Sequence, residues 1–245
     1  MNFKSDNEAP VHPKILQALA EANQGFATAY AEDDWSLELD DAFSTLFETP
    51  CQVLPLATGT AANSITLASI VPEWGAVMCH ALAHIENDEG GAPEFYTHGA
   101  KLITLQGEGG KLMPAELARA IDAAGSHGVH NVKPALVSIT QATECGTSYR
   151  PEEIRAIAEV AHARGLPLHM DGARFANAVA FLGQSPAEVT WKAGVDVLSF
   201  GATKNGALTA EAIVVFGHPE WLEKMQRMRK RGGHLLSKMR YVSAQ

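Results

Sequence analysis

The chain has 245 residues, of which 46% are hydrophobic and 19% are charged, and this composition is that of a globular protein with a sizeable core. Its 28 acidic residues against 19 basic ones give a formal net charge of −9, which argues against a nucleic-acid-binding protein. Nowhere do about 18 apolar residues follow one another, and the first residues lack an apolar stretch, so we expect neither a membrane span nor a signal peptide.

Short apolar runs rich in Val, Ile and Leu alternate along the chain with longer stretches of helical periodicity. This alternation is typical of βαβ units, so we expect an α/β fold with a mainly parallel central sheet flanked by helices. The clearest helix spans 151–164, where Pro151 suits the first turn and Gly165 supplies the stop. The expected strands lie at 51–55, 76–79, 102–105, 135–140, 166–170, 195–200 and 212–216.

No repeat, low-complexity tract or linker divides the chain, so residues 1–245 are expected to form one large domain. The last part, 220–245, would begin a connection to a C-terminal region, and it reads as a helix in progress without a stop signal, which indicates a truncated product. Arg227, Arg229, Lys230 and Arg231 within it suggest a solvated helix end. Three cysteines form neither a disulfide framework nor a zinc cluster, so a cytoplasmic setting fits best.

A Thr58-Gly59-Thr60 turn lies between the first expected strand and an apolar helix. Backbone amides at a helix start, together with small residues and hydroxyls, can form a phosphate cradle. Taken alone, such a turn is weak evidence for a cradle, because ordinary helix capping explains it more often. The turn matches neither the Walker pattern nor the dinucleotide-binding glycine pattern, so nucleotides are not favoured.

His84 lies in a polar, Gly-rich segment that directly follows a strong strand. This context predicts a site loop in which an imidazole stacks on a flat ring or moves a proton. The plainer interpretation is a surface or hydrogen-bonded histidine. A metal site is the less favoured alternative, because no convincing ligand geometry follows from its candidate ligands, His80, His84, Glu86, Asp88 and Glu89.

Asp171 directly follows the apolar run at 166–170, so it should reach the carboxyl edge of the sheet. A buried carboxylate needs a cationic partner, and the protonated nitrogen of a pyridoxal ring would provide one. Asp is also a favoured helix N-cap, and a helix could start near Ala173. Both interpretations stay open at this point.

Lys204 follows the strand at 195–200 in a loop flanked by Gly201 and Gly206. Its amine would therefore also lie at the carboxyl edge, where α/β proteins bind ligands. A partly desolvated amine in such a place can act as a nucleophile toward carbonyls. A lone lysine after a strand is more often a solvated loop residue, and only its partners favour the catalytic interpretation.

Taken in order, these motifs resemble the threonine aldolase family of fold-type I pyridoxal-phosphate enzymes, and the resemblance spans nearly the whole chain. Each motif is modest, but five in the same order and spacing are specific together. The matching segments are Ser5-Asp6-Asn7, Thr58-Gly59-Thr60-Ala61-Ala62-Asn63, Ala83-His84 with Gly90-Gly91-Ala92, His169-Met170-Asp171-Gly172-Ala173-Arg174 and Thr203-Lys204-Asn205-Gly206.

The resemblance implies pyridoxal 5′-phosphate as cofactor and a role for each matching residue. Lys204 matches the lysine that carries the cofactor as a Schiff base, Asp171 the partner of the pyridine nitrogen, and His84 the imidazole stacked on the ring. The phosphate cradle corresponds to Thr58, Gly59 and Thr60, with Arg174 also in the cofactor-binding set. Ser5 and Arg174 match groups that hold the substrate carboxylate, while His130 falls near the family's second histidine, with His127 as a rival.

The activity implied is retro-aldol cleavage of L-threonine, L-allo-threonine or phenylserine-like β-hydroxy-α-amino acids to glycine and an aldehyde. The alternatives are another fold-type I enzyme, such as an aminotransferase or a β-eliminating lyase, or a truncated, non-catalytic protein that binds the cofactor. Family members continue into a small C-terminal domain that this chain lacks. They are homo-oligomers, dimers or tetramers, with sites at subunit interfaces, where basic residues such as those near Arg229 can reach a neighbour's phosphate.

Overall fold

The computed structural model describes residues 4–245, and the seven strands in this part of the chain form a single sheet in the order β1-β7-β6-β5-β4-β2-β3. The strands from β2 to β6 run parallel, whereas β7 runs antiparallel to both of its neighbours, β6 and β1. The expected mainly parallel sheet is therefore confirmed. The strands are β1 Cys51–Leu56, β2 Gly75–His80, β3 Lys101–Leu105, β4 Lys133–Thr140, β5 Leu168–Gly172, β6 Val197–Gly201 and β7 Glu211–Phe216.

β5 starts two residues later than the apolar run suggests. The backbone amide of Leu166 donates to the Ala161 carbonyl and so still closes the end of the preceding helix, and Pro167 has no amide hydrogen to give to a ladder. The strand instead extends to Gly172, which pairs with Phe200 of β6. The shift places Asp171 inside the ladder rather than beyond it.

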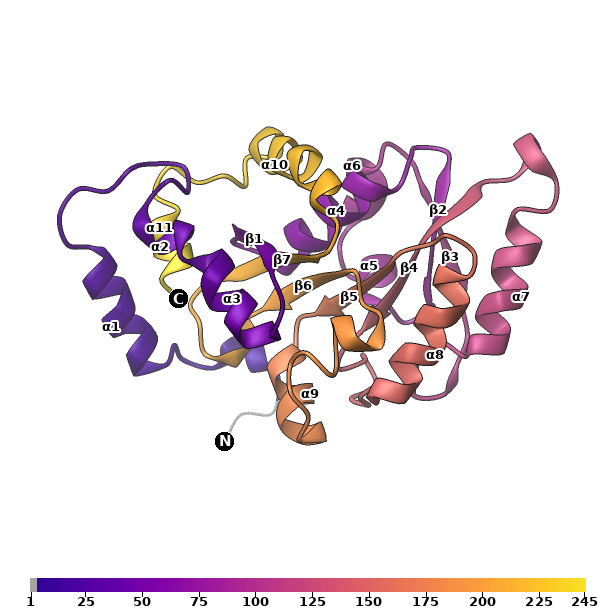
Figure 1. The fold of residues 1–245 in the computed structure, drawn as a ribbon, viewed down its shortest axis with the longest axis horizontal. Coiled ribbons are helices and arrows are strands. Elements are labelled where there is room, and N and C mark those ends of the chain that lie inside the picture. Colours follow the sequence, from indigo (N-terminus) through magenta and orange to yellow (C-terminus); the bar gives the residue numbers. More distant parts are fainter. Residues whose placement is uncertain (1–3) are drawn as a thin grey trace.

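Helices cover both faces of the sheet (Figure 1). On one face α3, α7, α8 and α9 pack over β1 and over the strands from β3 to β6, and on the other face α4 lies across the middle with α5, α6 and α10 around it. The helices are α1 Pro13–Ala22, α2 Asp34–Leu37, α3 Leu39–Phe47, α4 Gly59–Ile70, α5 His84–Asn87, α6 Ala92–Tyr96, α7 Pro114–Ala124, α8 Pro151–His162, α9 Phe175–Leu182, α10 Leu222–Arg231 and α11 Arg240–Ser243.

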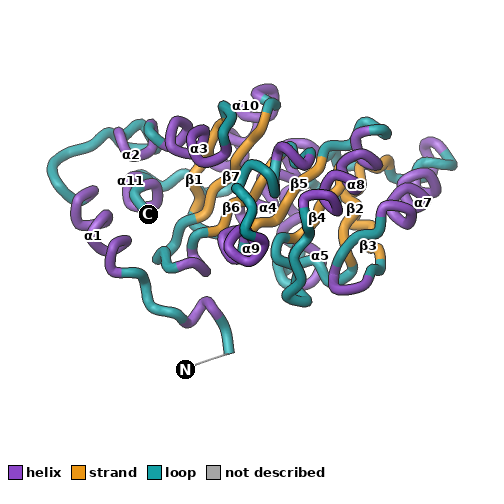
Figure 2. The backbone as a smooth tube through the Cα atoms, turned by 60° about the horizontal axis from the view of Figure 1, so that its bottom comes forward, coloured by secondary structure: helices purple, strands orange, loops and turns teal. Residues whose placement is uncertain are grey.

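Apolar clusters line both faces of the sheet, whose strands lie between the helices (Figure 2). Beneath α3 and α9, the rings of Phe47, Phe175 and Phe216 meet at centroid distances of 5.2–5.9 Å. Burial of each such ring contributes about 1.5–3 kcal/mol. Beneath α4 lies a polar ladder, in which the buried His169 ring binds the hydroxyls of Ser138 and Ser199 at 2.9 Å each. Burial lowers the pKa of His169 to about 4, so this imidazole is a neutral part of the core.

The basic cluster on α10 is not wholly solvated as expected. Arg229 is only 7% exposed, and its Nη1 donates to the Pro55 carbonyl at 3.2 Å. Burial lowers the pKa of Arg229 to about 10. Arg227 pairs instead with Glu223, and the Lys230 ammonium lies 4.4 Å from the Tyr30 ring centroid. α10 thus packs on α4 through one buried cation and keeps the others at the surface.

Helices in the described residues, 4–245, are all too short or too polar to cross a membrane. The 220–245 segment packs on the rest of the fold, since α10 contacts α4 and α11 contacts α1 and α2.

Candidate active site

A cavity of about 380 Å³ opens where the parallel strands end at their carboxyl edge. Its walls come from the start of α4, the ends of β4 and β5, the loop after β6, and the first residue of β7. Thr140 and Asp171 are register partners on adjacent strands, and Lys204 follows β6 by three residues. Of the residues singled out in the sequence, Thr58, Gly59, Thr60, His84, Asp171, Arg174 and Lys204 line this cavity together.

Lys204 is held on a short turn, Thr203–Asn205, that ends at Gly206. Gly206 has φ +102°, a backbone conformation that favours glycine, and its carbonyl accepts from the His12 amide at 2.8 Å. The N-terminal segment therefore fixes the loop from outside. Lys204 is half-buried, and the solvated-loop interpretation does not describe its position.

Asp171 is 5% exposed and has a partner on each oxygen. Its Oδ1 accepts from the Ala173 amide at 3.0 Å, and its Oδ2 accepts from Asn63 Nδ2 at 2.9 Å. The N-cap of α9 is Arg174, three residues later, so the helix-cap interpretation of Asp171 is wrong. What remains is a buried carboxylate that faces the cavity from the middle of the sheet.

The start of α4 presents the amides of its first turn to the cavity. Thr58 is the N-cap, and its Oγ1 accepts from the Ala61 amide at 3.2 Å. The Gly59 and Thr60 amides belong to the first turn, whose N–H groups have no acceptor within the helix and which carries a partial positive charge. Capping and anion binding thus occur at the same turn, and neither interpretation excludes the other.

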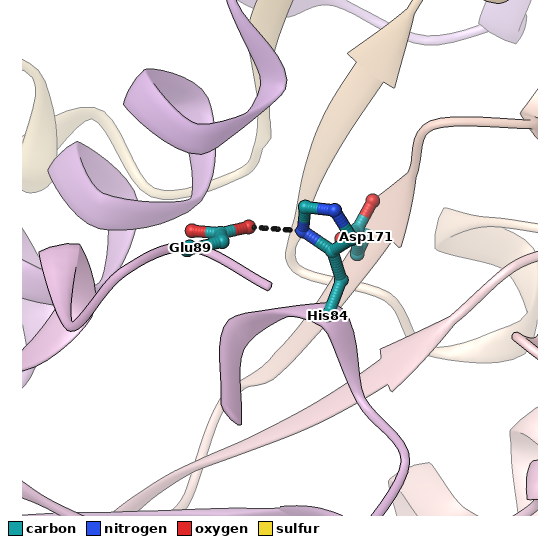
Figure 3. Close-up of side chains that lie close together, drawn as sticks. All are labelled: His84, Glu89 and Asp171. Carbon is teal, nitrogen blue, oxygen red and sulfur yellow. Dashed lines mark hydrogen bonds and ion pairs between the residues drawn. The ribbon is translucent and has the colours of Figure 1, made fainter. Parts of the chain in front are cut away.

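His84 and Glu89 form a hydrogen-bonded pair beside Asp171 (Figure 3). His84 Nδ1 lies 2.9 Å from Glu89 Oε1; the His84 side chain is 38% exposed, whereas that of Glu89 is fully buried. Asn63 Nδ2 donates to Glu89 Oε1 at 2.7 Å as well as to Asp171. One amide group therefore connects the two carboxylates, and the histidine ring lies over the cavity side of the pair.

The pKa values of this pair are both raised. The hydrogen bond to Glu89 raises the pKa of His84, and burial raises the pKa of Glu89. The two raised pKa values are consistent with one proton shared between His84 and Glu89. This hydrogen bond occupies His84 Nδ1 and leaves Nε2 free to face the cavity.

The same three side chains raise the question of a metal ion. One ligand atom each from His84, Glu89 and Asp171 lie within 4.8 Å of one another. However, the lone pairs of Glu89 Oε1 and Asp171 Oδ2 already point at the N–H donors of Asn63. These hydrogen bonds already engage two of the three candidate ligand atoms, whereas Glu89 Oε2 has no partner within residues 4–245, so the cluster suits an N–H-bearing organic ligand better than a metal ion.

Arg174 and Ser5 are arranged differently from the expectation that they hold a carboxylate. The Arg174 guanidinium already forms a two-pronged ion pair with Asp6, with Nε–Oδ2 at 2.7 Å and Nη2–Oδ1 at 3.0 Å. This pair, mainly its hydrogen bond, lowers the pKa of Asp6. Ser5 caps the turn at Asp6–Glu8 by accepting from the Asn7 amide, and it is Asn7 that lines the cavity.

His130 does not line this cavity of the single described chain, and its expected place near the substrate's side-chain hydroxyl stays a prediction. It belongs to the turn Gly128–His130 before β4, whereas the cavity is reached at Thr140, where β4 ends. Eight residues of strand separate the two ends by about 26 Å. His127, the rival, lies in the same exposed region at the amino edge of the sheet.

Among the polar residues that line the cavity, Glu144 and Glu211 were not singled out from the sequence, while Asn63 appeared only within a matching segment and Glu89 only as a less favoured metal ligand. Asn63 is a polar residue inside a helix that is buried nearly all round, and that contrast is the signal that could have revealed it. Glu144 accepts from the His84 amide at 2.8 Å and from Thr140 Oγ1 at 3.0 Å, so it braces the His84 loop. No local pattern distinguishes Glu89 or Glu211 from surface acids, because their burial depends on distant segments.

Comparisons with known proteins point to one family. Residues 2–245 match the family model described as beta-eliminating lyase. The chain is 48% and 50% identical to low specificity L-threonine aldolases of Pseudomonas sp. (strain NCIMB 10558) and Pseudomonas aeruginosa, covering 99% of this chain and 69% of each relative. Its fold matches the solved threonine aldolase of Leishmania major with a TM-score of 0.90 at 30% identity, covering 98% of this chain and 69% of that one.

Proposed function

The chain belongs to the beta-eliminating lyase family, and from that premise we propose that it uses pyridoxal 5′-phosphate to cleave β-hydroxy-α-amino acids of the threonine and phenylserine type into glycine and an aldehyde. The observation that carries the proposal is the meeting of Lys204, Asp171 and the first turn of α4 at one cavity. These are an amine, a buried carboxylate and an anion cradle, the three groups that a phosphorylated pyridine aldehyde requires.

The residues present fit this cofactor. The amides of Gly59 and Thr60, with the hydroxyl of Thr60, would hold the phosphate at the positive end of α4. Asp171 would hold the protonated ring nitrogen through a charge-assisted hydrogen bond. Two buried acceptors beside it, Asn63 Oδ1 and Glu89 Oε2, have no hydrogen-bond partner in the described residues, as expected of a pocket built for a further group.

When bound, the cofactor supplies a carbonyl that condenses with amines and a conjugated ring that accepts the electron pair released at Cα. Lys204 would hold it covalently and return as the amine that receives it after each turnover. Asp171 would keep the ring nitrogen protonated.

His84 stands at the mouth of the cavity, with Nδ1 held by Glu89 and Nε2 available to a substrate. We assign it two tasks: stacking on the cofactor ring and receiving the proton of the substrate's β-hydroxyl oxygen, directly or through a water. Arg174 would bind the substrate carboxylate by sharing its guanidinium between that group and Asp6. Ser5 would support that binding through the cap that positions Asn7.

The direct test is to mix the purified chain with pyridoxal 5′-phosphate and L-threonine, L-allo-threonine or L-phenylserine and to assay for glycine and aldehyde. Formation of both in equal amounts supports the proposal. The family model's own description favours a second candidate, β-elimination, which would release ammonia and a 2-oxo acid instead. Cofactor absorbance without any product would indicate a binding protein that does not turn over.

We further propose that the chain works in the cytoplasm as a homo-oligomer, a dimer or tetramer, acting on a small amino acid. Phe95 and Phe181 are 77% and 80% exposed, and a subunit interface would cover apolar rings of this kind. Light scattering of the purified protein tests the assembly, since a monomer at micromolar concentration would contradict it.

A further inference from the structure

Glu211 is an acidic residue at the end of the cavity where an anion would bind. It is the first residue of β7, and because β7 runs antiparallel, its amino end lies at the carboxyl edge of the other strands. Its register partners are Leu56 of β1 and Gly201 of β6, which lead into the cradle at Thr58 and into the Lys204 turn. The strand direction therefore delivers this carboxyl group into the site.

The carboxyl group lies against the first turn of α4. Its Oε2 is 3.8 Å from the position that a Cβ on Gly59 would occupy, and Gly59 is the first residue of that helix. Thr203, on the Lys204 turn, lines the cavity with it, and hydrogen bonding by Thr203 lowers the pKa of Glu211. Glu211 is thus held between the cradle and the Lys204 turn, and it lines the cavity together with both.

A carboxylate in this position conflicts with a phosphate. Two like charges a few ångströms apart in a partly buried site repel each other by several kcal/mol unless a cation or a proton intervenes. The charged groups that face Glu211 are Asp171, which adds to the repulsion, and Lys204, which opposes it. Lys204 is also the amine that the proposed function consumes in binding the cofactor, so it cannot serve as the permanent counterion.

We propose that Glu211 is a phosphate-binding residue that acts as a neutral carboxylic acid, donating its proton to a phosphate oxygen in the α4 cradle. The inference rests on the proposed function, because the phosphate is that of pyridoxal 5′-phosphate. At a pH above the pKa of the empty site, cofactor binding then takes up one proton at Glu211. The pocket accepts a phosphate without needing a cation from its own walls.

Burial already raises the pKa of Glu211 to about 7 before any phosphate arrives, Thr203 opposing the rise and Asp171 adding to it. A neighbouring phosphate dianion disfavours the carboxylate further, so the pKa rises again in the complex. Phosphate affinity is therefore full below pH 7 and falls as the pH rises through the pKa of the empty site. The second ionisation of the phosphate, near pH 6, is complete above pH 7 and does not cause this fall.

The test compares pyridoxal 5′-phosphate with pyridoxal, which lacks the phosphate, by spectroscopic titration of the cofactor-free protein between pH 6 and pH 9. The ratio of the two affinities cancels every pH-dependent contribution that the two compounds share. For the unaltered protein this ratio should fall about tenfold per pH unit above pH 7, as linkage of one proton requires. In Glu211→Gln, whose amide donates at every pH, the ratio should stay constant over that range.

Glu159→Gln, an exposed acid on α8, is the matched control and should follow the unaltered protein. Thermal unfolding of each variant verifies that it is folded. Equal pH dependence in the unaltered protein and Glu211→Gln would overturn the inference. The inference would also be overturned if Glu211→Gln bound pyridoxal 5′-phosphate no more tightly than pyridoxal at every pH. That result would mean that Glu211 acts as a charged carboxylate that orients a cation.

Failure of the proposed function gives a different result, since then neither compound becomes attached to Lys204. The phosphorus NMR shift of the bound phosphate provides a second measurement. In the unaltered protein it should move as the pH rises through the raised pKa of Glu211 in the complex, and in Glu211→Gln it should show no such step.

Discussion

Two histidine–carboxylate pairs lie at opposite edges of the same sheet, and their distances are nearly identical. His84 and Glu89 are 2.9 Å apart at the carboxyl edge, and His162 and Asp196 are 2.8 Å apart at the amino edge. The carboxylate of the first pair is fully buried, whereas the His162 side chain is 42% exposed and that of Asp196 is 16% exposed. Only the first pair faces the cavity.

The difference lies in what each carboxylate does besides binding its histidine. Asp196 also accepts from the Leu168 amide at 2.6 Å and from His218 at 3.3 Å, so it fastens the start of β5 to the loop after β7. Glu89 keeps one oxygen, Oε2, without a hydrogen-bond partner among residues 4–245. A short distance between a histidine and an acid shows only that the two are hydrogen-bonded. Burial of the acid next to a cavity is what makes such a pair a candidate for catalysis.

The largest effect in the carboxyl-edge region should come from Lys204→Ala. Loss of the amine removes covalent attachment of the cofactor, so cleavage of L-threonine should be undetectable and the visible absorbance of the bound cofactor should shift. Borohydride reduction of the unaltered protein followed by peptide mapping should place the label on Lys204. A label on Lys101 or Lys192 would contradict the site as described.

His84→Phe separates the two tasks assigned to the imidazole, since phenylalanine keeps a flat ring but cannot take a proton. We expect the cofactor absorbance to remain and cleavage to slow by about 10²- to 10⁴-fold, the usual contribution of general acid–base catalysis. Steady-state kinetics on L-threonine measures this. Equal rates would mean that His84 is not the base and would point to a bound water or to Glu144.

Glu89→Gln should have a smaller effect with a distinct pH signature. The charged hydrogen bond it weakens is worth about 1.5–3 kcal/mol, so the rate should fall by about ten- to a hundredfold. Glu89 raises the pKa of His84, and neutral His84 is the form that accepts a proton. The acidic limb of the rate profile should therefore move to lower pH in the variant, and an unmoved limb would show that Glu89 only packs.

His162→Ala tests the amino edge and should change little. An exposed ion pair contributes about 0–1 kcal/mol, and Asp196 retains its bonds to Leu168 and His218. Urea unfolding should show a loss within that range, with kinetics unchanged. A loss of activity comparable to that of Glu89→Gln would contradict the view that only the pair at the carboxyl edge serves catalysis.

Much of the fold follows from local pattern. All seven strands lie where apolar runs predict them, and the helix expected at 151–164 is α8, Pro151–His162, with Gly165 at φ +68° beyond its end. The direction of β7 was not anticipated. Nine residues, 202–210, connect β6 to β7 without an α-helix, and a parallel crossover needs a dozen or more. That short connection is a signal of antiparallel pairing that the apolar periodicity alone does not carry.

The site was predictable in part, for reasons visible in its residues. Asp171 and Lys204 directly follow strands, so strand direction brings them to one edge. His130 precedes its strand, and the same rule places it at the other edge. Glu89 and Asn63 meet across a sequence separation of 26 residues, and Asn63 and Asp171 across 108, which no local periodicity reports.

The strand order also has a consequence for folding during synthesis on the ribosome. β1 leads into the phosphate cradle, yet it lies at the edge of the sheet and pairs with β7, whose first residue, Glu211, follows Leu56 by 155 positions (211 − 56). At synthesis rates of about 5–20 residues per second, that interval lasts roughly 8–30 s. The cradle segment must wait until β7 has been synthesised before β1 can pair with a neighbouring strand, so we expect competence to bind cofactor to appear only after residues 211–216 have left the ribosome.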